Sequence, residues 1–574
     1  MSIQKLAVDG GAPVRTEPLP SVSNKSGRDF GQEEMANLTE VMNSGKLFRY
    51  GGKYVVQLEQ EFAGMLGLKH GIASTSGTSA IHIAIGAIQP NPGDEIITSP
   101  ITDMGTLIGI LAQNAIPVFA DLDPKTYTVM PESIKSLITE KTKAIIPVHL
   151  FGQMADMDPI LEIGRKHNIK VIEDCCQAYF SEYNGHLSGT MGEINCFSMQ
   201  QSKHMTTGDG GITVTDNDEL STRAKLFMDK GWPREPGVPR EYLFLGMNYR
   251  MNELTGAVAA AQIKKVRGTV EKRRKVADAI TKLIKDAPGV IVPHVREGCK
   301  HSWWLYPLTI DQSAMKCTPA EFAAALSKEG IPAGVGYIGK PIFTTEIFQK
   351  QRACGYGCPF TCPHATPREY KESDTPNTLE ILANIMPLSL NEFFTEKDIE
   401  DYGKAINKVA NAYARSMSAG KMGYSTTEVG DMIADLVKQG DAQPQDSPAR
   451  GVAVQPEQRG ICPHCGKPVC SVGSTTPTPG DIIAIQENTA LDRMLPSLSA
   501  TLYGVKMPSP EEMWWNQQPK RCAKCGSIWH GQCIALALAH SVKLQAGGTV
   551  LPDMHKCPKK GILGRCNGDL IILT

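Results

Sequence analysis

The sequence predicts an α/β protein with a mainly parallel sheet in a large first domain, a smaller α+β domain after it, and a small cysteine-rich domain at the end. Strand-like and helix-like segments alternate between residues 95 and 174, which is typical of a parallel sheet covered by helices. The chain has 574 residues, of which 41% are hydrophobic, so it can bury the cores of two or more domains. Eight of the 16 cysteines follow position 460, which sets the last region apart.

The first half of the chain supplies the predicted parallel sheet and its helices. Residues 1–30 are rich in Gly, Pro and Ser and predict an arm with little regular structure. Helices are expected at 32–43, 55–66, up to about 113, and at 131–137, with strands at 95–98, 116–120, 144–150 and 169–174. A further helix is predicted to start at 156–159, with Pro159 as its first residue. Asp174 then falls at the carboxyl end of a strand, where ligands of open α/β sheets bind.

The second half predicts the smaller domain. Helical signals run from 217 to about 230 and from 252 to about 285, separated by a loop at 231–240 that is rich in Pro and Gly. A strand at 303–310, a helix at 318–330 that opens with a capping box, and a last helix at 395–414 follow. We therefore expect a large domain at 1–270, a small domain at 271–416, a linker at 417–460 and the cysteine-rich domain at 461–574.

Charge and hydropathy exclude some classes of partner. The net charge is -1 and the pI is near 6.9, so no bulk electrostatic attraction to nucleic acid or acidic membranes is expected, although local patches stay possible. The N-terminal residues have no apolar stretch of signal-peptide length, and the chain has no run long enough to span a membrane. We expect a cytoplasmic protein whose cysteines are thiols and metal ligands, because disulfides are rare in that compartment.

Two short segments carry residues suited to chemistry. Small residues at 74–79 precede a helical pattern, so Gly77, Thr78 and Ser79 should lie at a helix N-terminus, which binds anions or is simply capped by Ser and Thr. The segment 196–211 places Lys203 among small polar residues ahead of three glycines. A lysine attacks a carbonyl and forms a Schiff base only where its pKa is lowered, and most lone lysines are solvated surface groups.

Six motifs in order resemble the DegT-type sugar aminotransferases between about residues 10 and 415. The motifs are GGAPVR (10–15), SGTSA (76–80), PVFAD (117–121), IEDCCQA (172–178), CFSMQQSKHMTTGDGG (196–211) and GMNYRM (246–251). The resemblance implies the type I fold of the transferases that depend on pyridoxal 5'-phosphate (PLP), with helix 252–285 linking its two domains. Gln200, where most of the family has histidine, brings the chain nearer to the branch that acts on keto-inositols and related cyclitols.

The resemblance also implies roles for individual residues. Lys203 would hold PLP as a Schiff base and move the proton, and Asp174 would keep the ring nitrogen protonated. Gln177 would sit beside the ring hydroxyl, while Gly77, Thr78, Ser79 and Ser198 would hold the phosphate. Asn248 would reach the phosphate of the neighbouring subunit, which implies a homodimer with shared active sites. For each residue the alternative is a buried hydrogen-bonding group without a cofactor.

Three residues are candidates for substrate contact. By the same resemblance, the loop that contains Arg49 and Tyr50 borders the active site, although it could equally be an ordinary surface turn. Asp103 stands where the family usually places an aromatic ring that stacks on the cofactor. Since a carboxylate cannot stack in this way, either Asp103 meets the substrate or the cofactor edge, or the alignment slips here.

The last region predicts a zinc site of the RING-like or ribbon type. Cys462 and Cys465, and then Cys522 and Cys525, form two Cys-x2-Cys-Gly knuckles, whose thiolates can reach one tetrahedral ion. The candidate ligands are Cys462, Cys465, Cys522, Cys525, His530, Cys533, Cys557 and Cys566. The resemblance to RING-like fingers implies two ions held by alternate pairs and a protein partner; one ion held by the four knuckle thiols is the alternative. Cys354, Cys358 and Cys362 cluster with His364 and could hold a metal, but their spacing matches no common metal site, and we expect free thiols there.

These observations favour one function over two others. We expect an aminotransferase that moves an amino group from glutamate or glutamine to a keto-sugar or keto-cyclitol, joined to a zinc-binding interaction module. One alternative is a scaffold or regulator that keeps the fold and acts through the zinc module. The other is a PLP-dependent sugar dehydratase, in which the family replaces the lysine by histidine. Lys203 argues against the dehydratase, even though His204 is adjacent.

Overall fold

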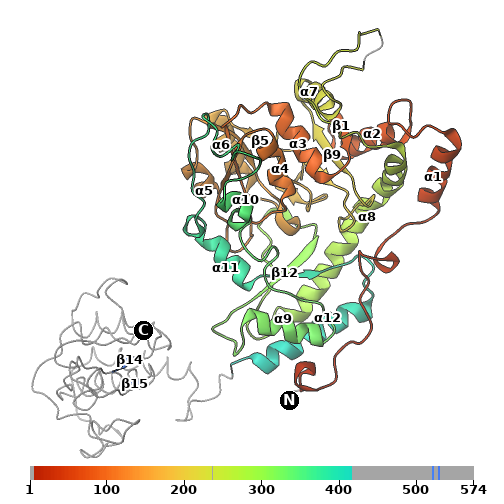
Figure 1. Cartoon of the computed structure of the whole chain (residues 1–574). Coiled ribbons are helices and arrows are strands. Elements are labelled where there is room, and N and C mark those ends of the chain that lie inside the picture. The colour runs from red at the N-terminus through yellow and green to blue at the C-terminus, as the bar shows by residue number, and fades with distance from the viewer. Residues whose placement is uncertain (1–4, 235–236, 416–519, 522–527, 530–574) are drawn as a thin grey trace, which may run out of the picture. The chain divides into compact units, whose positions relative to one another are not determined.

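The computed structural model describes residues 5–234, 237–415, 520–521 and 528–529 (Figure 1). The chain divides into two units near residue 427. In the second unit, β14 (Lys520–Arg521) pairs antiparallel with β15 (Ile528–Trp529), on either side of the second cysteine knuckle. All eight predicted zinc ligands and the predicted linker at 417–460 lie outside the described residues.

The large domain is built on a parallel sheet with the order β3-β2-β4-β5. Its strands are β2 (Glu95–Thr98), β3 (Ile116–Phe119), β4 (Thr142–Ile146) and β5 (Lys170–Val171). Parallel bridges from Asp174 to Val148 and to Cys196 join this sheet to a second one with the order β1-β9-β8. Its strands are β1 (His70–Ser74), β8 (Asn195–Ser198) and β9 (Gly211–Thr215). Asp174 is therefore at the junction of the two sheets.

Helices cover both faces of the parallel sheet because its strands are apolar on both sides. Ile96 points into the core beneath α3 (Gly77–Ile88), α4 (Gly105–Ala112) and α7 (Asp218–Met228). Its neighbour Ile97 points into the opposite core, beneath α5 (Pro131–Ser136) and α6 (Met157–His167). Successive strand residues face opposite sides, and strands buried on both faces are continuous apolar runs. The alternation of the sequence thus produces the layers that Figure 1 shows.

The long helix α8 (Glu253–Ile284) connects the two domains (Figure 1). It begins where the Asn252 side chain accepts a hydrogen bond from the backbone of Thr255 at 2.9 Å, as N-cap residues do. Its first half packs against α1 (Gln32–Ser44) and α2 (Tyr54–Leu66), and its second half packs against α12 (Glu396–Tyr413). The boundary predicted at residue 270 falls inside this helix.

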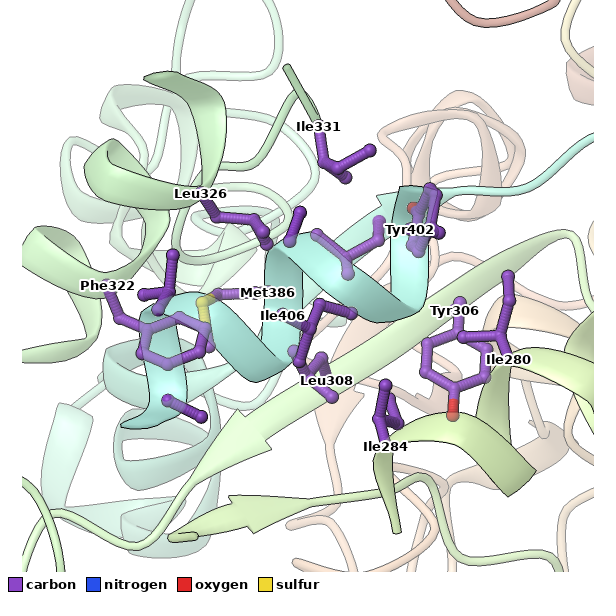
Figure 2. Close-up of a cluster of buried hydrophobic side chains, with 14 of the residues drawn as sticks. Ile280, Ile284, Tyr306, Leu308, Phe322, Leu326, Ile331, Met386, Tyr402 and Ile406 are labelled. Carbon is purple, nitrogen blue, oxygen red and sulfur yellow. The ribbon is translucent and has the colours of Figure 1, made fainter. Parts of the chain in front are cut away.

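The small domain is an antiparallel sheet with helices on one side. The sheet has the order β10-β12-β13, formed by β10 (Val290–Ile291), β12 (Leu305–Ile310) and β13 (Met386–Ser389). Figure 2 shows its core, in which Phe322 and Leu326 of α9 (Pro319–Lys328) face Met386 and Ile406. Burial of one such side chain contributes about 1.5–3 kcal/mol. The remaining elements are α10 (Glu346–Gln349), α11 (Pro376–Asn384) and a minor sheet of β6 (Glu182–Tyr183), β7 (His186–Leu187) and β11 (Cys299–Lys300).

The structure confirms most predicted elements and corrects three points. The parallel sheet, the long helix and the capping box at Thr318 are all present. However, α6 begins at Met157, two residues before Pro159. The prediction of a mainly parallel sheet holds for β3-β2-β4-β5 but did not include the second sheet, in which β9 runs antiparallel to both β1 and β8. The sequence reading also missed β1 and the β8–β9 hairpin, whose turn carries the lysine segment.

Candidate active site

A cavity of about 310 Å³ lies at the carboxyl ends of the parallel strands, next to the N-terminus of α3. Segments that are far apart in the sequence line it, and they come from both domains. The lining includes Ser76, Gly77, Thr78, Thr102, Asp103, Thr106, Asp174, Cys176, Gln177, Ser198, Gln200, Lys203, Asp209, Trp304 and Tyr337. The cavity therefore brings together the motifs that the sequence analysis singled out from separate parts of the chain.

The N-terminus of α3 forms one wall. Ser76 caps the helix by accepting a hydrogen bond from the backbone of Ser79 at 3.0 Å, and the first turn leaves other backbone N–H groups free to bind an anion. Gly77 lies so close to the hairpin that a Cβ atom on it would be 2.6 Å from the Ser198 Cβ. The Ser79 hydroxyl instead bonds to Thr75 and Ser76 behind the wall. Gly77, Thr78 and Ser198 thus line the cavity, whereas Ser79 does not.

Asp174 presents a buried carboxylate to the cavity and is only 3% exposed. One carboxylate oxygen accepts a hydrogen bond from the Thr106 hydroxyl at 2.8 Å, and the other accepts one from the backbone of Cys176 at 3.1 Å. The backbone of Asp174 is held between neighbouring strands by its bridges to Val148 and Cys196. Thr106 was not predicted, because nothing in its local sequence shows that α4 places it beside Asp174.

A buried network stands directly behind this carboxylate. The His149 ring lies 3.0 Å from the Glu173 carboxylate, and both side chains are fully buried. Burial raises the pKa of Glu173, but hydrogen bonds from His149 and from backbone amides outweigh burial and hold that pKa below its ordinary value. The amides of Gly189, Met191 and Gly192 already occupy the carboxylate oxygens. This group is therefore a structural support for the strand end that carries Asp174.

Lys203 lies in the β8–β9 hairpin turn and is held there by its neighbours. Its own carbonyl accepts a hydrogen bond from Arg28 at 2.9 Å, and the carbonyl of Ser202 accepts one from the Trp304 indole at 2.9 Å. The Lys203 Nζ sits 3.7 Å from the centre of the Trp304 ring. Part of the Lys203 side chain remains accessible, but its amine is enclosed. Burial lowers the pKa of Lys203, although nearby acidic groups oppose the shift.

The small domain provides the aromatic rings of the cavity. The rings of Trp304 and Tyr337 meet edge to face, with centroids 5.9 Å apart. Burial, followed by the nearby carboxylates of Asp103 and Asp174, raises the pKa of Tyr337 well above its usual value, so its hydroxyl stays protonated. Gln177 lines the same side and accepts a hydrogen bond from the backbone of Phe151 at 2.8 Å. Sequence analysis missed both rings, because only folding brings them to the site.

Asp103 lines the cavity, but the other two predicted substrate residues do not. An Asp103 carboxylate oxygen accepts a hydrogen bond from the backbone of Gly105 at 2.7 Å. Arg49 is instead paired with the largely buried Glu59 carboxylate at 2.8 Å, so its guanidinium is used inside the domain. Tyr50 is 40% exposed and lies outside the lining. Asn248 is also exposed and does not line the cavity of its own chain.

The donor set fits PLP. An enclosed amine, a buried carboxylate and a helix N-terminus with hydroxyls on its wall suit an aldehyde, a basic ring nitrogen and a phosphate, respectively. Gly77 leaves open, beside Ser198, a space that a Cβ would fill. The described residues thus supply a complementary group for each functional part of that cofactor.

Comparison with known proteins agrees with this geometry. Residues 28–406 match the DegT/DnrJ/EryC1/StrS aminotransferase family. The spore coat polysaccharide biosynthesis protein SpsC of Bacillus subtilis (strain 168) is 32% identical over 389 residues, covering 66% of this chain and 95% of that protein. A protein of Streptoalloteichus tenebrarius, provisionally named an L-glutamine:3-amino-2,3-dideoxy-scyllo-inosose aminotransferase, is 36% identical over 287 residues, covering 50% of this chain and 68% of that protein.

Solved structures give the same result. NtdA from Bacillus subtilis, determined with bound cofactor PMP, aligns with a TM-score of 0.56 and 26% identity, covering 66% of this chain and 81% of that chain. Among the described residues, no helix is both long and apolar enough to cross a membrane. The family match extends over most of the chain, and the cavity fits the cofactor expected for that family. This protein therefore belongs to the DegT/DnrJ/EryC1/StrS aminotransferase family and is an aminotransferase of the PLP-dependent type.

Proposed function

We propose that this enzyme transfers an amino group from glutamate or glutamine to the carbonyl carbon of a keto-sugar or keto-cyclitol, with PLP attached to Lys203. The observation that carries the proposal is that the Lys203 amine and the Asp174 carboxylate line one cavity together with the N-terminus of α3. A keto-cyclitol acceptor and a glutamine donor are supported by the name of the Streptoalloteichus relative. The presence of Lys203 disfavours the dehydratase alternative, because dehydratases of this family have histidine at that position.

We assign a separate role to each group of residues in the cavity. When bound, PLP supplies an electron sink for the carbon that gains or loses its proton. Asp174, oriented by Thr106, would hold a proton on the ring nitrogen by charge attraction. Gly77, Thr78 and Ser198 would bind the phosphate at the helix N-terminus. Gln177 would lie beside the ring hydroxyl.

Lys203 is the proton carrier of this site. Burial lowers the pKa of Lys203, so a larger fraction of its amine is free at neutral pH than in a solvated lysine. The Trp304 ring lies 3.7 Å from that amine, and its indole anchors the carbonyl of Ser202 at 2.9 Å. Trp304 therefore holds Lys203 in position, and its ring encloses the amine away from bulk water.

Asp103 and Tyr337 are the residues that we assign to the acceptor. A carboxylate and a protonated phenol can bind the hydroxyl groups of a sugar or cyclitol, which both donate and accept hydrogen bonds. The Asp103 carboxylate can accept further hydrogen bonds, since a carboxylate takes several and, among the described residues, only the backbone of Gly105 donates to it. Asn248 would complete the phosphate site of a second subunit, so we propose a homodimer with shared active sites.

We further propose that residues 461–574 bind zinc and recognise a protein partner. The proposal is supported by the spacing of the two Cys-x2-Cys-Gly knuckles and by the paired strands β14 and β15 on either side of the second knuckle. Two ions per chain are expected if the eight candidate ligands act in alternate pairs, and one ion if only the knuckle thiols bind. Metal content of the purified full-length chain decides between them.

The proposed activity is tested with purified protein, PLP, a glutamine or glutamate donor and a panel of keto-sugars and keto-inositols. Aminated product should form with the wild type and disappear in Lys203→Ala. Lys203→Arg keeps a positive charge but has no free amine at neutral pH, so it should be inactive as well. Product formation by Lys203→Ala at the wild-type rate would contradict the proposal.

A further inference from the structure

The segment at 340–370 of the small domain carries three cysteines that the proposed reaction does not use. It lies against the large domain, where the backbone of Ile342 donates a hydrogen bond to the carbonyl of Pro100 at 3.0 Å. The Lys141 amine donates to the carbonyl of His364 at 2.7 Å. The segment is thus held at both ends against the sheet of the large domain.

Two of these thiols face each other. The Sγ atoms of Cys358 and Cys362 are 2.8 Å apart, whereas the Cys354 Sγ lies 3.4 Å from the carbonyl oxygen of Cys358. Cys354 is exposed, and Cys358 and Cys362 are partly exposed, so reagents in solution can reach them. Cys358 and Cys362 therefore form a pair, and the Cys354 thiol lies next to Cys358, where it contacts both the side chain and the carbonyl oxygen of that residue.

The loop that brings the pair together is already ordered by other contacts. Gly357 has a φ of 88°, which favours glycine, and a Cβ on it would be 2.6 Å from the Thr361 hydroxyl. Phe360, between the two cysteines, is buried against Phe348 and Tyr370 at centroid distances of 6.0 and 6.1 Å. The turn and the buried ring thus hold the backbone in the conformation that brings the two sulfurs to 2.8 Å from each other.

The geometry does not favour a metal ion at this place. Among the described residues, the one grouping with three potential ligand atoms close enough to share an ion is His149, Glu173 and Cys175, next to Asp174 at the sheet junction. His364 is exposed, and within the described part of the chain the sulfur atoms of Cys354, Cys358 and Cys362 do not form such a grouping. Two thiols alone are a poor site for zinc, which takes four ligands.

We propose that Cys358 and Cys362 are a dithiol that low-molecular-weight disulfides, such as oxidised glutathione, convert reversibly into an intramolecular disulfide. The thiolate of one cysteine attacks a sulfur of the small disulfide and releases one small thiol. The second cysteine then attacks the mixed disulfide, its proton passes to solvent, and the second small thiol leaves. Overall, two protein thiols are oxidised and one small disulfide is reduced to two thiols.

Peptide mapping tests this pair directly. Cleavage after Arg352 and Arg368 releases residues 353–368, which contain Cys354, Cys358 and Cys362 and no other cysteine. After the full-length protein has been incubated with oxidised glutathione, denatured and alkylated, this peptide should lack two hydrogens and carry one alkyl group, on Cys354. Dithiothreitol should restore three alkyl groups.

Variants separate the pair from its neighbour. Cys354→Ser should still form the disulfide to the wild-type extent, whereas Cys362→Ser should yield only a mixed glutathione adduct or a free thiol. The proposal is wrong if the wild-type peptide stays fully alkylated, if Cys354→Ser loses the disulfide, or if a chelator rather than a reductant restores alkylation. That last result would identify a bound metal.

Discussion

The contact between Gly77 and the β8–β9 hairpin predicts that Gly77→Ala weakens binding of the cofactor. The added Cβ would lie 2.6 Å from the Cβ and 2.8 Å from the hydroxyl of Ser198, so the helix or the hairpin must move apart. Overpacking of this kind costs about 1–3 kcal/mol. If that strain falls on the phosphate site between the two segments, the dissociation constant for PLP rises about 5-fold to about 150-fold.

The assay is equilibrium dialysis of the cofactor-free enzyme against PLP, with Gly64→Ala as the matched control. Gly64 lies within α2, and a Cβ there meets no atom within 4 Å, so that variant should bind PLP like the wild type. The second variant, Ser198→Gly, removes the opposing side chain and leaves the Ser198 Cα, at 3.2 Å, as the nearest atom to the new methyl group. The combined loss in Gly77→Ala/Ser198→Gly should be smaller than the sum of the two single losses. Wild-type affinity in Gly77→Ala, or strict additivity, would refute the reasoning.

Three other variants or probes test the remaining contacts. Thr106→Val removes the donor to Asp174 and should lower kcat about 10-fold, the effect of about 1.4 kcal/mol; Thr106→Ser keeps the hydroxyl and should retain most of the activity in the same steady-state assay. Since burial lowers the pKa of Lys203, competitive amine labelling of the cofactor-free enzyme should be half-complete at a lower pH for Lys203 than for exposed lysines, and equal midpoints would contradict the shift. Arg49→Ala leaves Glu59 buried without its partner and should destabilise the fold by about 3–5 kcal/mol in denaturant titrations; a change in KM with unchanged stability would instead make Arg49 a substrate residue.

Sequence motifs located the residues that can be recognised from their neighbours in the chain. Lys203 lies in one of the motifs that resemble a known family, and Asp174 ends an apolar strand within another, so the motifs pointed to both residues. The helix N-terminus at Gly77 and Thr78 was also readable from small residues ahead of an apolar helical pattern. The structure brings all four to one cavity.

The residues that were missed depend on contacts between distant segments. Trp304 and Tyr337 reach the cavity from the small domain, and Thr106 reaches Asp174 only because α4 packs beside the strand end. Ser79 and Arg49 were predicted at the site, but in the structure their polar groups have partners within the fold. The hydroxyl of Ser79 completes a capping cluster with Ser76, and the guanidinium of Arg49 neutralises Glu59. A polar side chain in a motif can serve the fold as readily as the ligand.

Strand direction was the other feature of the fold that the sequence pattern could not predict. Buried parallel and antiparallel strands both appear as short apolar runs, so the antiparallel pairing of β9 with β1 and β8 had no signal in periodicity. That pairing matters for function, because it forms the hairpin whose turn presents Lys203. The hairpin is therefore a feature that tertiary contacts, and not local pattern, bring into place.

The most direct test of the account is to identify the amino acid that is covalently attached to PLP. The full-length enzyme is loaded with PLP and treated with borohydride, which reduces a Schiff base to a stable amine, and the peptides are then sequenced by mass spectrometry. The account predicts a pyridoxyl group on Lys203 and none in Lys203→Ala. A pyridoxyl group on a different lysine, or an unmodified Lys203 in an enzyme that still transfers amino groups, would contradict it.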